Sequence, residues 1–281
     1  PGSDLIATLP RRRQGYAFRA SYDYAQRYLL EVNAGYNGSE NFARGHRWGF
    51  FPSIAVGWNV SKEAFWKPLQ NTVSNLKLRA SYGLVGNDKT VDQRFIYLEE
   101  VVLSGDKHRP NFSTGFDGSY ESRRGPGFTR YANPQITWEI GKKLNVGLDL
   151  QLFKSLNLTV DVFQEIRSNI FQKKETIPNY FGTEDAKIYG NLAKVKNWGV
   201  DVAMEYNKQF NKDWTIQARG TFTFARNRVL EYDEAANLRP ALRKVGSRLN
   251  GLLGYAADGY YIDQADIDHN PKSTLGNIAI A

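Results

Sequence analysis

Residues 136–152 read ITWEIGKKLNVGLDLQL, a stretch in which apolar and polar residues alternate. Successive side chains of a β-strand point to opposite faces, so the alternation predicts a strand with one apolar and one polar face. The segment is roughly three times as long as an average strand of ~5–6 residues in a soluble protein. Long two-faced strands are typical of transmembrane β-barrels, which turn the apolar face to lipid and the polar face to the lumen. The apolar positions are Ile136, Trp138, Ile140, Leu144, Val146, Leu148, Leu150 and Leu152.

The same period of two keeps its phase through eight segments between Tyr16 and Phe224, with the apolar residues on even-numbered positions. The connections between these segments alternate between short turns and long polar loops. Outer-membrane barrels show this asymmetry, with short periplasmic turns and longer extracellular loops. The sequence therefore predicts short turns at 25–27, 154–157 and 211–213, long loops at 37–49, 86–135 and 173–192, and a less regular connection at 61–75.

The constant phase also predicts which side chains face lipid. Barrels carry girdles of aromatic residues near their strand ends, and four tryptophans fall on the even face: Trp58, Trp138, Trp198 and Trp214. We expect the outer face to include Trp138, Leu144, Val146, Leu148, Leu150, Val200 and Val202. We expect the lumen to be lined by the charges at odd positions, which are Glu31, Arg79, Glu139, Asp149, Asp161, Asp201, Glu205 and Arg219.

The composition narrows the alternatives further. The chain has no cysteine, so it has neither disulfides nor thiolate metal sites, and it has no run of ~18 apolar residues that would predict a transmembrane helix. Its mean hydropathy of −0.52 is compatible with a barrel, because only every second residue of a barrel strand faces lipid and the other residues are polar. The net charge of +8 would favour binding to nucleic acid or to an anionic membrane surface. Because the strand aromatics lie mostly on the apolar face, we expect no nucleic-acid partner.

Two soluble folds share the alternation of apolar and polar residues. A β-sandwich buries one face of each sheet, and a lipocalin-type barrel turns its apolar residues inward. Neither explains the strand length, the alternating loop lengths and the aromatic residues at strand ends. We therefore predict an all-β fold, an antiparallel transmembrane β-barrel of which this chain supplies about 8–9 strands.

An ordered series of short motifs resembles the SusC/RagA type of TonB-dependent outer-membrane transporters. The series covers most of residues 15–262. Its members are RYLL at 27–30, NGSENF at 37–42, RWGFFPS at 47–53, GWNVSKEAF at 57–65, LKLRASYG at 76–83 with GN at 86–87, NP at 133–134 with TWE at 137–139, NVGLD at 145–149, GNLAKVKNWGVD at 190–201, and GY at 254–255 with DGYY at 258–261.

The resemblance implies an importer of oligosaccharides or peptides in the bacterial outer membrane, with outer-membrane lipid around its wall. It implies a SusD-like lipoprotein lid and TonB as protein partners, and a 22-stranded barrel with a plugged lumen. The sequence contains no plug domain and no TonB-binding segment, so we expect residues 1–281 to be a partial barrel domain from the C-terminal half. We expect this piece to form an open sheet with two unpaired edges.

Two other functions stay open at this point: an assembly or adhesion barrel that moves no substrate, and a barrel enzyme. No catalytic motif is present, so we expect no catalytic residues, no cofactor and no metal. The acidic run at Asp263, Asp266 and Asp268 resembles a calcium loop, but Pro271 stands where such a loop needs glycine, which favours a solvated loop.

The candidate contact residues for a ligand or a lid lie in the long region 86–135, which we place on the extracellular side. Loops commonly carry function, and this one is rich in aromatic residues and arginine. The alternative is that these side chains only pack against one another. The candidates are Phe112, Phe116, Tyr120, Arg123, Arg124, Phe128 and Tyr131.

Overall fold

The computed structural model describes residues 9–89, 94–102, 111–114, 121–124, 127–177, 188–236, 238–251 and 262–269. The chain divides into two compact units, Pro1–Leu249 and Asn250–Ala281. In the second unit the described part includes one short helix, α2 (Gln264–His269), in the stretch with the acidic run. In the described parts of the chain, no helix is long and apolar enough to cross a membrane.

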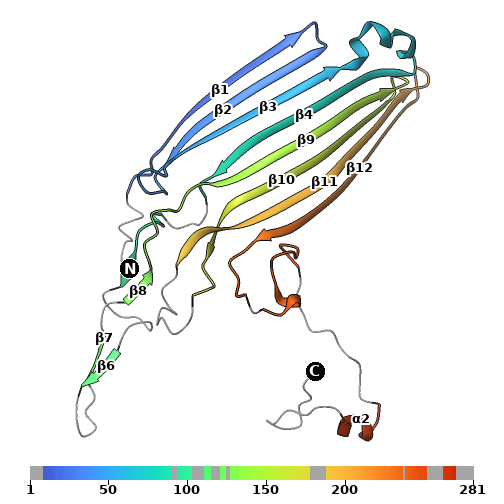
Figure 1. Cartoon of the computed structure of the whole chain (residues 1–281). Coiled ribbons are helices and arrows are strands. Elements are labelled where there is room, and N and C mark those ends of the chain that lie inside the picture. The colour runs from blue at the N-terminus through green and yellow to red at the C-terminus, as the bar shows by residue number, and fades with distance from the viewer. Residues whose placement is uncertain are drawn as a thin grey trace. The chain divides into compact units, whose positions relative to one another are not determined.

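The first unit is built on one antiparallel sheet of eight strands, in which each strand pairs with the next one along the sheet (Figure 1). This is the arrangement expected for the wall of a barrel, and the sheet is open, with β1 and β12 as its edges. The strands are β1 (Arg13–Tyr24), β2 (Tyr28–Ser39), β3 (Trp48–Asn59), β4 (Val73–Asn87), β9 (Glu139–Leu152), β10 (Leu156–Lys173), β11 (Tyr189–Gln209) and β12 (Thr215–Glu231). The predicted partial antiparallel barrel is confirmed.

The connections fall into two groups at opposite ends of this sheet (Figure 1). At the turn end, the strands are joined by residues 25–27, 60–72, 153–155 and 210–214. The connection 60–72 contains two 3₁₀ helices, η1 (Val60–Lys62) and η2 (Ala64–Leu69). At the loop end, the connections are residues 40–47, 88–138 and 174–188. The long connection 88–138 includes two small hairpins, β5 (Glu100–Val102) with β8 (Gly127–Arg130), and β6 (Asn111–Thr114) with β7 (Glu121–Arg124).

Two of the tight turns place non-glycine residues in the left-handed region of backbone conformation. Ala25 and Gln26 both have φ of 53°, and the amide of Arg27 donates to the carbonyl of Tyr24 at 2.9 Å. Phe153 and Lys154 have φ of 51° and 56° in the same arrangement. In each of these three-residue connections the first two residues have positive φ, a conformation that matches the twist of the flanking strands and explains why the chain tolerates the strain.

The strand register explains how one phase can hold across the sheet. Even-numbered residues pair with even-numbered residues at each strand interface, apart from short register shifts near strand ends. Tyr16 pairs with Tyr36, which pairs with Phe50, and Val146 pairs with both Ala80 and Val162. The even positions therefore form one continuous apolar face and the odd positions one polar face.

The prediction for strand 136–152 was wrong at its start. β9 begins at Glu139, and Ile136 and Trp138 lie in the connection before it with exposed fractions of 0% and 7%. Trp138 packs edge-on against Phe51, an odd-numbered residue, at a ring distance of 5.2 Å. Trp138 is therefore buried near the polar face and does not belong to the outer girdle.

Candidate functional site

The apolar face carries aromatic residues in two bands. At the turn end, Tyr24 pairs with Tyr28 and Tyr28 with Trp58. At the loop end, Tyr16 pairs with Tyr36 and Tyr36 with Phe50. Each of the three strands thus has one aromatic residue in each band, eight positions apart (16 and 24, 28 and 36, 50 and 58). From one band to the other each strand runs nine residues, within the range of about 9–11 residues in which a strand tilted by ~45° crosses the hydrocarbon core of a bilayer.

The side chains between the two bands are apolar and exposed. Val56, Leu78, Val146 and Met204 expose 41–51% of their surface. Exposed apolar surface of this extent on one face of a sheet marks an interaction site, and its height matches a bilayer. The outward facing predicted for Leu144, Val146, Trp58, Trp198 and Trp214 agrees with their exposure.

Glu63 fastens the turn-end band. Its carboxylate accepts hydrogen bonds from the Tyr28 hydroxyl at 2.8 Å and the Trp58 indole at 3.2 Å, and it lies 3.6 Å from the Arg27 guanidinium. Three interactions lower the pKa of the Glu63 carboxyl. The largest is the hydrogen bond from Tyr28, the next is the hydrogen bond from Trp58, and the positive charge of Arg27 adds a smaller effect. Because Glu63 lies in a connection, no strand periodicity could have predicted this contact.

The lowered pKa of Glu63 predicts a pH dependence. A carboxyl whose pKa is lowered in the folded state stabilises it above the ordinary pKa, about 4.3 for glutamate, and this contribution is lost as the pH falls through the folded value. We expect heat stability to decline below about pH 4.3 in the wild type and to decline less in Glu63→Gln. Thermal melts at pH 7 and pH 3.5, followed by tryptophan fluorescence, measure this. Glu99→Gln, at an exposed loop position, is the control, and an equal pH response in both variants would refute the assignment.

The polar face holds ion pairs that link neighbouring strands. The strongest cluster joins three strands, because the Arg79 guanidinium on β4 contacts Asp149 of β9 at 2.9 Å and Asp161 of β10 at 3.1 Å. Gly147 pairs with both Arg79 and Asp161. A Cβ at Gly147 would lie 2.6 Å from the Asp161 Oδ1 and 2.8 Å from the Arg79 Cζ, so a side chain there would displace the guanidinium or the carboxylate from this cluster. Further pairs on this face are Arg19–Glu31, Arg167–Glu139, Arg167–Glu165 and Arg219–Glu205.

The structure pairs most of the predicted lumen charges across neighbouring strands. Arg79 contacts Asp149 and Asp161, and Arg219 contacts Glu205, whereas Glu31 and Glu139 pair with arginines outside the predicted set. Charges neutralised in this way make a polar lining that needs no ligand.

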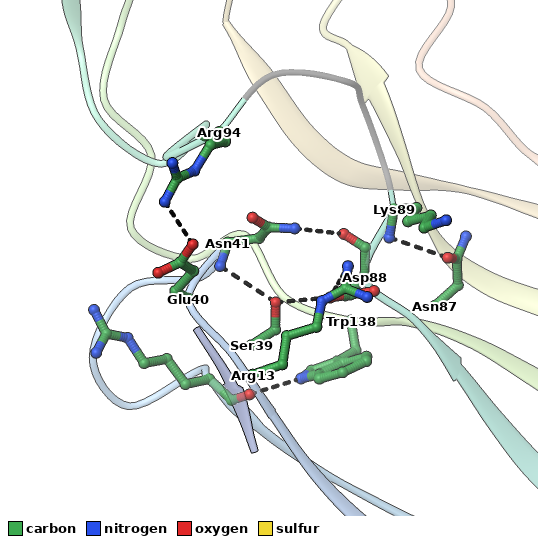
Figure 2. Close-up of polar contacts among 10 residues, drawn as sticks. Arg13, Ser39, Glu40, Asn41, Asn87, Asp88, Lys89, Arg94 and Trp138 are labelled. Atoms are coloured by element: carbon green, nitrogen blue, oxygen red, sulfur yellow. Dashed lines mark hydrogen bonds and ion pairs between the residues drawn. The ribbon is translucent and has the colours of Figure 1, made fainter. Parts of the chain in front are cut away.

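A polar cluster lies at the loop end, where β2, the start of β1 and the end of β4 meet (Figure 2). The buried Ser39 donates its hydroxyl proton to Asp88 at 2.8 Å, and Arg13 contacts the same carboxylate at 2.9 Å. Asn41 donates its side-chain amide to the Asp88 carbonyl at 3.1 Å. These contacts tie the loop 40–47 to the start of the long connection 88–138.

A small hydrophobic core lies beside this polar cluster. Phe42, Ile96, Ile136 and Trp138 are buried against one another, with Phe51, Ile140, Phe171 and Tyr189 packed around them. The Trp138 indole donates to the Arg47 carbonyl at 3.0 Å (Figure 2). The core gathers residues from the loops 40–47 and 88–138 and from the strands flanking 174–188, so the described loop bases form one packed body.

Two asparagines of the motif series fix the end of the long connection. Asn191 accepts from the amide of Thr137 at 2.9 Å and donates to the Thr137 carbonyl at 3.0 Å. Asn133 donates its side-chain amide to the Tyr189 carbonyl at 2.7 Å. These motif residues therefore have a structural role, holding the stretch before β9 against β11.

Among the seven predicted contact residues, the structure describes the side chains of Phe128 and Tyr131, and it brings these two together. The rings of Phe128 and Tyr131 stack at 5.5 Å with an interplanar angle of 10°, and Phe128 is 42% exposed. Between them, Arg130 is buried and donates its Nε proton to the Leu98 carbonyl at 3.0 Å. Phe112 pairs with Arg123 along the backbone of the β6–β7 hairpin, next to Arg124. The side chains of Phe112, Arg123 and Arg124, and the whole of Phe116 and Tyr120, lie outside the described residues.

A metal site is not visible in the parts of the chain that the structure describes. No group of three or more histidine, cysteine, aspartate or glutamate side chains is placed there to hold a metal ion. In the acidic run, the Gln264 amide donates to Asp268 at 3.2 Å within α2. The side chain of Asp266 lies outside the described residues.

An open antiparallel sheet with a banded apolar face and an ion-paired polar face defines the wall of a transmembrane β-barrel. Residues 3–276 match the sequence model of the family described as "TonB dependent receptor-like, beta-barrel". The chain belongs to this family, whose members are receptors and transporters and not enzymes.

The relatives are TonB-dependent receptors of Formosa agariphila and Bacteroides thetaiotaomicron. The chain is 30% identical over 246 residues to receptor P39 of the first organism, covering 86% of this chain and 22% of that protein. It is 28% identical over 271 residues to SusC of the second, covering 92% of this chain and 25% of that protein. The chain thus spans a quarter or less of the length of these relatives.

The fold has also been seen in solved structures. The RagAB peptide importer in its closed-closed state superimposes with a TM-score of 0.65 at 20% identity, over 83% of this chain and 24% of that one. Its open-open state gives a TM-score of 0.62. The family model, the SusC relative and the shared fold together confirm the resemblance to SusC/RagA-type receptors that the motif series indicated.

Proposed function

We propose that this chain forms part of the barrel wall of an outer-membrane importer for oligosaccharides or peptides. The observation that carries the proposal is the family match over a sheet whose exposed apolar face has the height of a bilayer. Within this proposal, residues 1–281 belong to the barrel domain, and the turn end faces the periplasm. Energy comes through TonB and a SusD-like lipoprotein covers the loop end.

The loop end is the side on which substrate and lid would be met. The hydrophobic core and the hydrogen bonds of Asn133 and Asn191 hold the two ends of the long connection 88–138 in place. Its described part presents the exposed Phe128–Tyr131 stack. Stacked aromatic rings offer apolar contact to sugar faces and to peptide side chains alike. We keep the set Phe112, Phe116, Tyr120, Arg123, Arg124, Phe128 and Tyr131 as the proposed contact residues.

Deletion of residues 111–125 in the full-length receptor that carries this segment tests the proposal. We expect uptake or lid binding to fall while the barrel still assembles, because the hairpin β6–β7 lies outside the eight-stranded sheet. Radiolabelled oligosaccharide and peptide uptake, lid co-purification and heat-modifiable gel mobility measure the three properties. Unchanged uptake and lid binding would show that residues 111–125 contact neither substrate nor lid. A wild-type receptor that shows neither uptake nor lid binding would favour the alternative of an assembly or adhesion barrel.

The orientation is tested with single cysteines. A cysteine at Ser113 should react with a membrane-impermeant maleimide in whole cells. A cysteine at Asn211, in a short turn, is the matched control and should react only after the outer membrane is permeabilised. The reverse pattern would show that the topology is inverted.

A further inference from the structure

A cavity of about 500 Å³ lies at the loop end beside β1, β2 and β3. This volume falls in the range of about 300–1,000 Å³ that small-molecule sites occupy. Four arginines line it, together with one carboxylate. Its charged lining residues are Arg12, Arg13, Arg47, Arg94 and Glu40.

Two of the four arginines are already neutralised. Arg94, whose side chain is 9% exposed, contacts Glu40 at 2.6 Å (Figure 2). It also donates to the carbonyls of Leu9 and Pro10. Arg13 contacts Asp88 at 2.9 Å. These two pairs build the framework of the cavity and leave its net charge to Arg12 and Arg47.

Arg12 and Arg47 keep donors for a ligand. Within the described residues, Arg12 makes no hydrogen bond or ion pair, and Arg47 uses only its Nε, which donates to the Phe42 carbonyl at 3.0 Å. Both terminal amino groups of the Arg47 guanidinium therefore have no partner among the described residues. Two arginine forks around one cavity suit an anion with several oxygens, above all a phosphate.

The position of the cavity indicates where such a phosphate would come from. Trp48 lines the cavity and belongs to the apolar face, where its ring stacks on Tyr36 at 4.7 Å and lies 6.3 Å from Tyr16. Tyr16 and Tyr36 form the loop-end aromatic band. Such bands sit at the level where acyl chains give way to headgroups, so the cavity lies at headgroup height, next to lipid.

We propose that the Arg12–Arg47 cavity binds the phosphate of an anionic lipid headgroup in the leaflet that surrounds the loop end. Arg12 and Arg47 hold the phosphate oxygens, Trp48 contacts the apolar part of the lipid, and the Arg94–Glu40 pair shapes the cavity. The proposal rests on the proposed membrane setting, but it does not depend on what the barrel transports.

Lipid binding to the full-length receptor tests the proposal. Bisphosphorylated lipid A and phosphatidylcholine are titrated separately into detergent-solubilised receptor, and bound lipid is counted by native mass spectrometry. We expect a preference for lipid A that falls about tenfold or more in Arg12→Gln/Arg47→Gln, because the double variant loses the charge-assisted hydrogen bonds of both guanidinium groups. Arg44→Gln changes an exposed arginine of the same loop that does not line the cavity, and should keep the preference.

Arg12→Gln alone guards against a folding artefact, because Arg12 supports no internal contact in the described structure. It should show a smaller but clear loss, and Arg47→Lys, which keeps the charge without the fork, should also bind more weakly. Equal lipid A binding in wild type and double variant would overturn the proposal. Displacement of lipid A by equimolar inorganic phosphate would overturn its lipid part. A wild-type receptor that binds lipid A but takes up neither oligosaccharide nor peptide would count against the importer function and leave the lipid site standing.

Discussion

Val146→Arg should destabilise the folded barrel by about 2–4 kcal/mol, the cost of a cation on the lipid face near the bilayer midplane. Val146 lies at the middle of β9 on the apolar face and is 51% exposed, between Ala80 and Val162 on the neighbouring strands. In a bilayer its arginine replacement would meet acyl chains. Denaturant titration of the receptor in lipid vesicles, followed by tryptophan fluorescence, measures the change.

Asn145→Arg is the matched control, one residue away on the polar face. Asn145 borders a cavity of about 460 Å³ that Arg79 and Glu31 also line, so an arginine side chain has room and a carboxylate nearby. We expect its cost to stay below about 1 kcal/mol. Equal costs for the two variants would mean that the two faces of β9 meet the same surroundings, against the membrane assignment.

Gly199→Ala should destabilise the sheet by about 1–3 kcal/mol, the range for overpacking a closely packed site. Gly199 lies on β11 opposite Phe163, and a Cβ there would meet the Phe224 carbonyl oxygen and come within 2.7 Å of the Phe163 Cζ. Since the carbonyl belongs to the backbone of β12, it cannot move aside as a side chain can. The glycine of the NWGVD motif therefore allows the backbone of β12 and the Phe163 ring to lie close to the backbone of β11.

Gly220→Ala provides the contrast within the same strand pair. A Cβ at Gly220 meets nothing within 4 Å among the described residues, so alanine should be neutral or stabilise by about 0.5–1 kcal/mol through lower chain entropy in the unfolded state. Vesicle unfolding free energies of both variants decide the point. An alanine at position 199 as harmless as one at position 220 would show that the close approach is not needed.

The period of two was enough to predict the sheet, because lipid on one face and polar surroundings on the other impose a strict alternation. It predicted the pairing of turns and loops, and the short turn at 153–155 differs from the predicted 154–157 by only a residue or two. It was wrong for Ile136 and Trp138, whose even positions continue the pattern of β9 although the chain there has left the strand. Their apolar character serves the hydrophobic core under the loops, which alternation alone cannot distinguish from a lipid face.

The contacts that shape the loop end could not be read from the sequence, because they join residues far apart in the chain. Ser39 meets Asp88, Asn133 meets Tyr189, and Arg94 meets Glu40 only after the sheet has formed. The Arg12–Arg47 cavity belongs to the same class, because its two arginines are 35 positions apart in the sequence. Among the predicted contact residues, Phe128 and Tyr131 are only three positions apart in the sequence. A contact between their side chains could therefore be expected from the sequence alone.

Spin labelling along β9 in lipid vesicles tests the membrane wall most directly. The segment has no cysteine, so single cysteines at positions 143–146 and 148–150 can be labelled one at a time, provided that any cysteines elsewhere in the receptor are removed. Labels at even positions should collide with oxygen dissolved in lipid, and labels at odd positions with a water-soluble nickel complex, giving a period of two. Even-position labels shielded from both reagents would place the apolar face in a dry protein core and contradict the account.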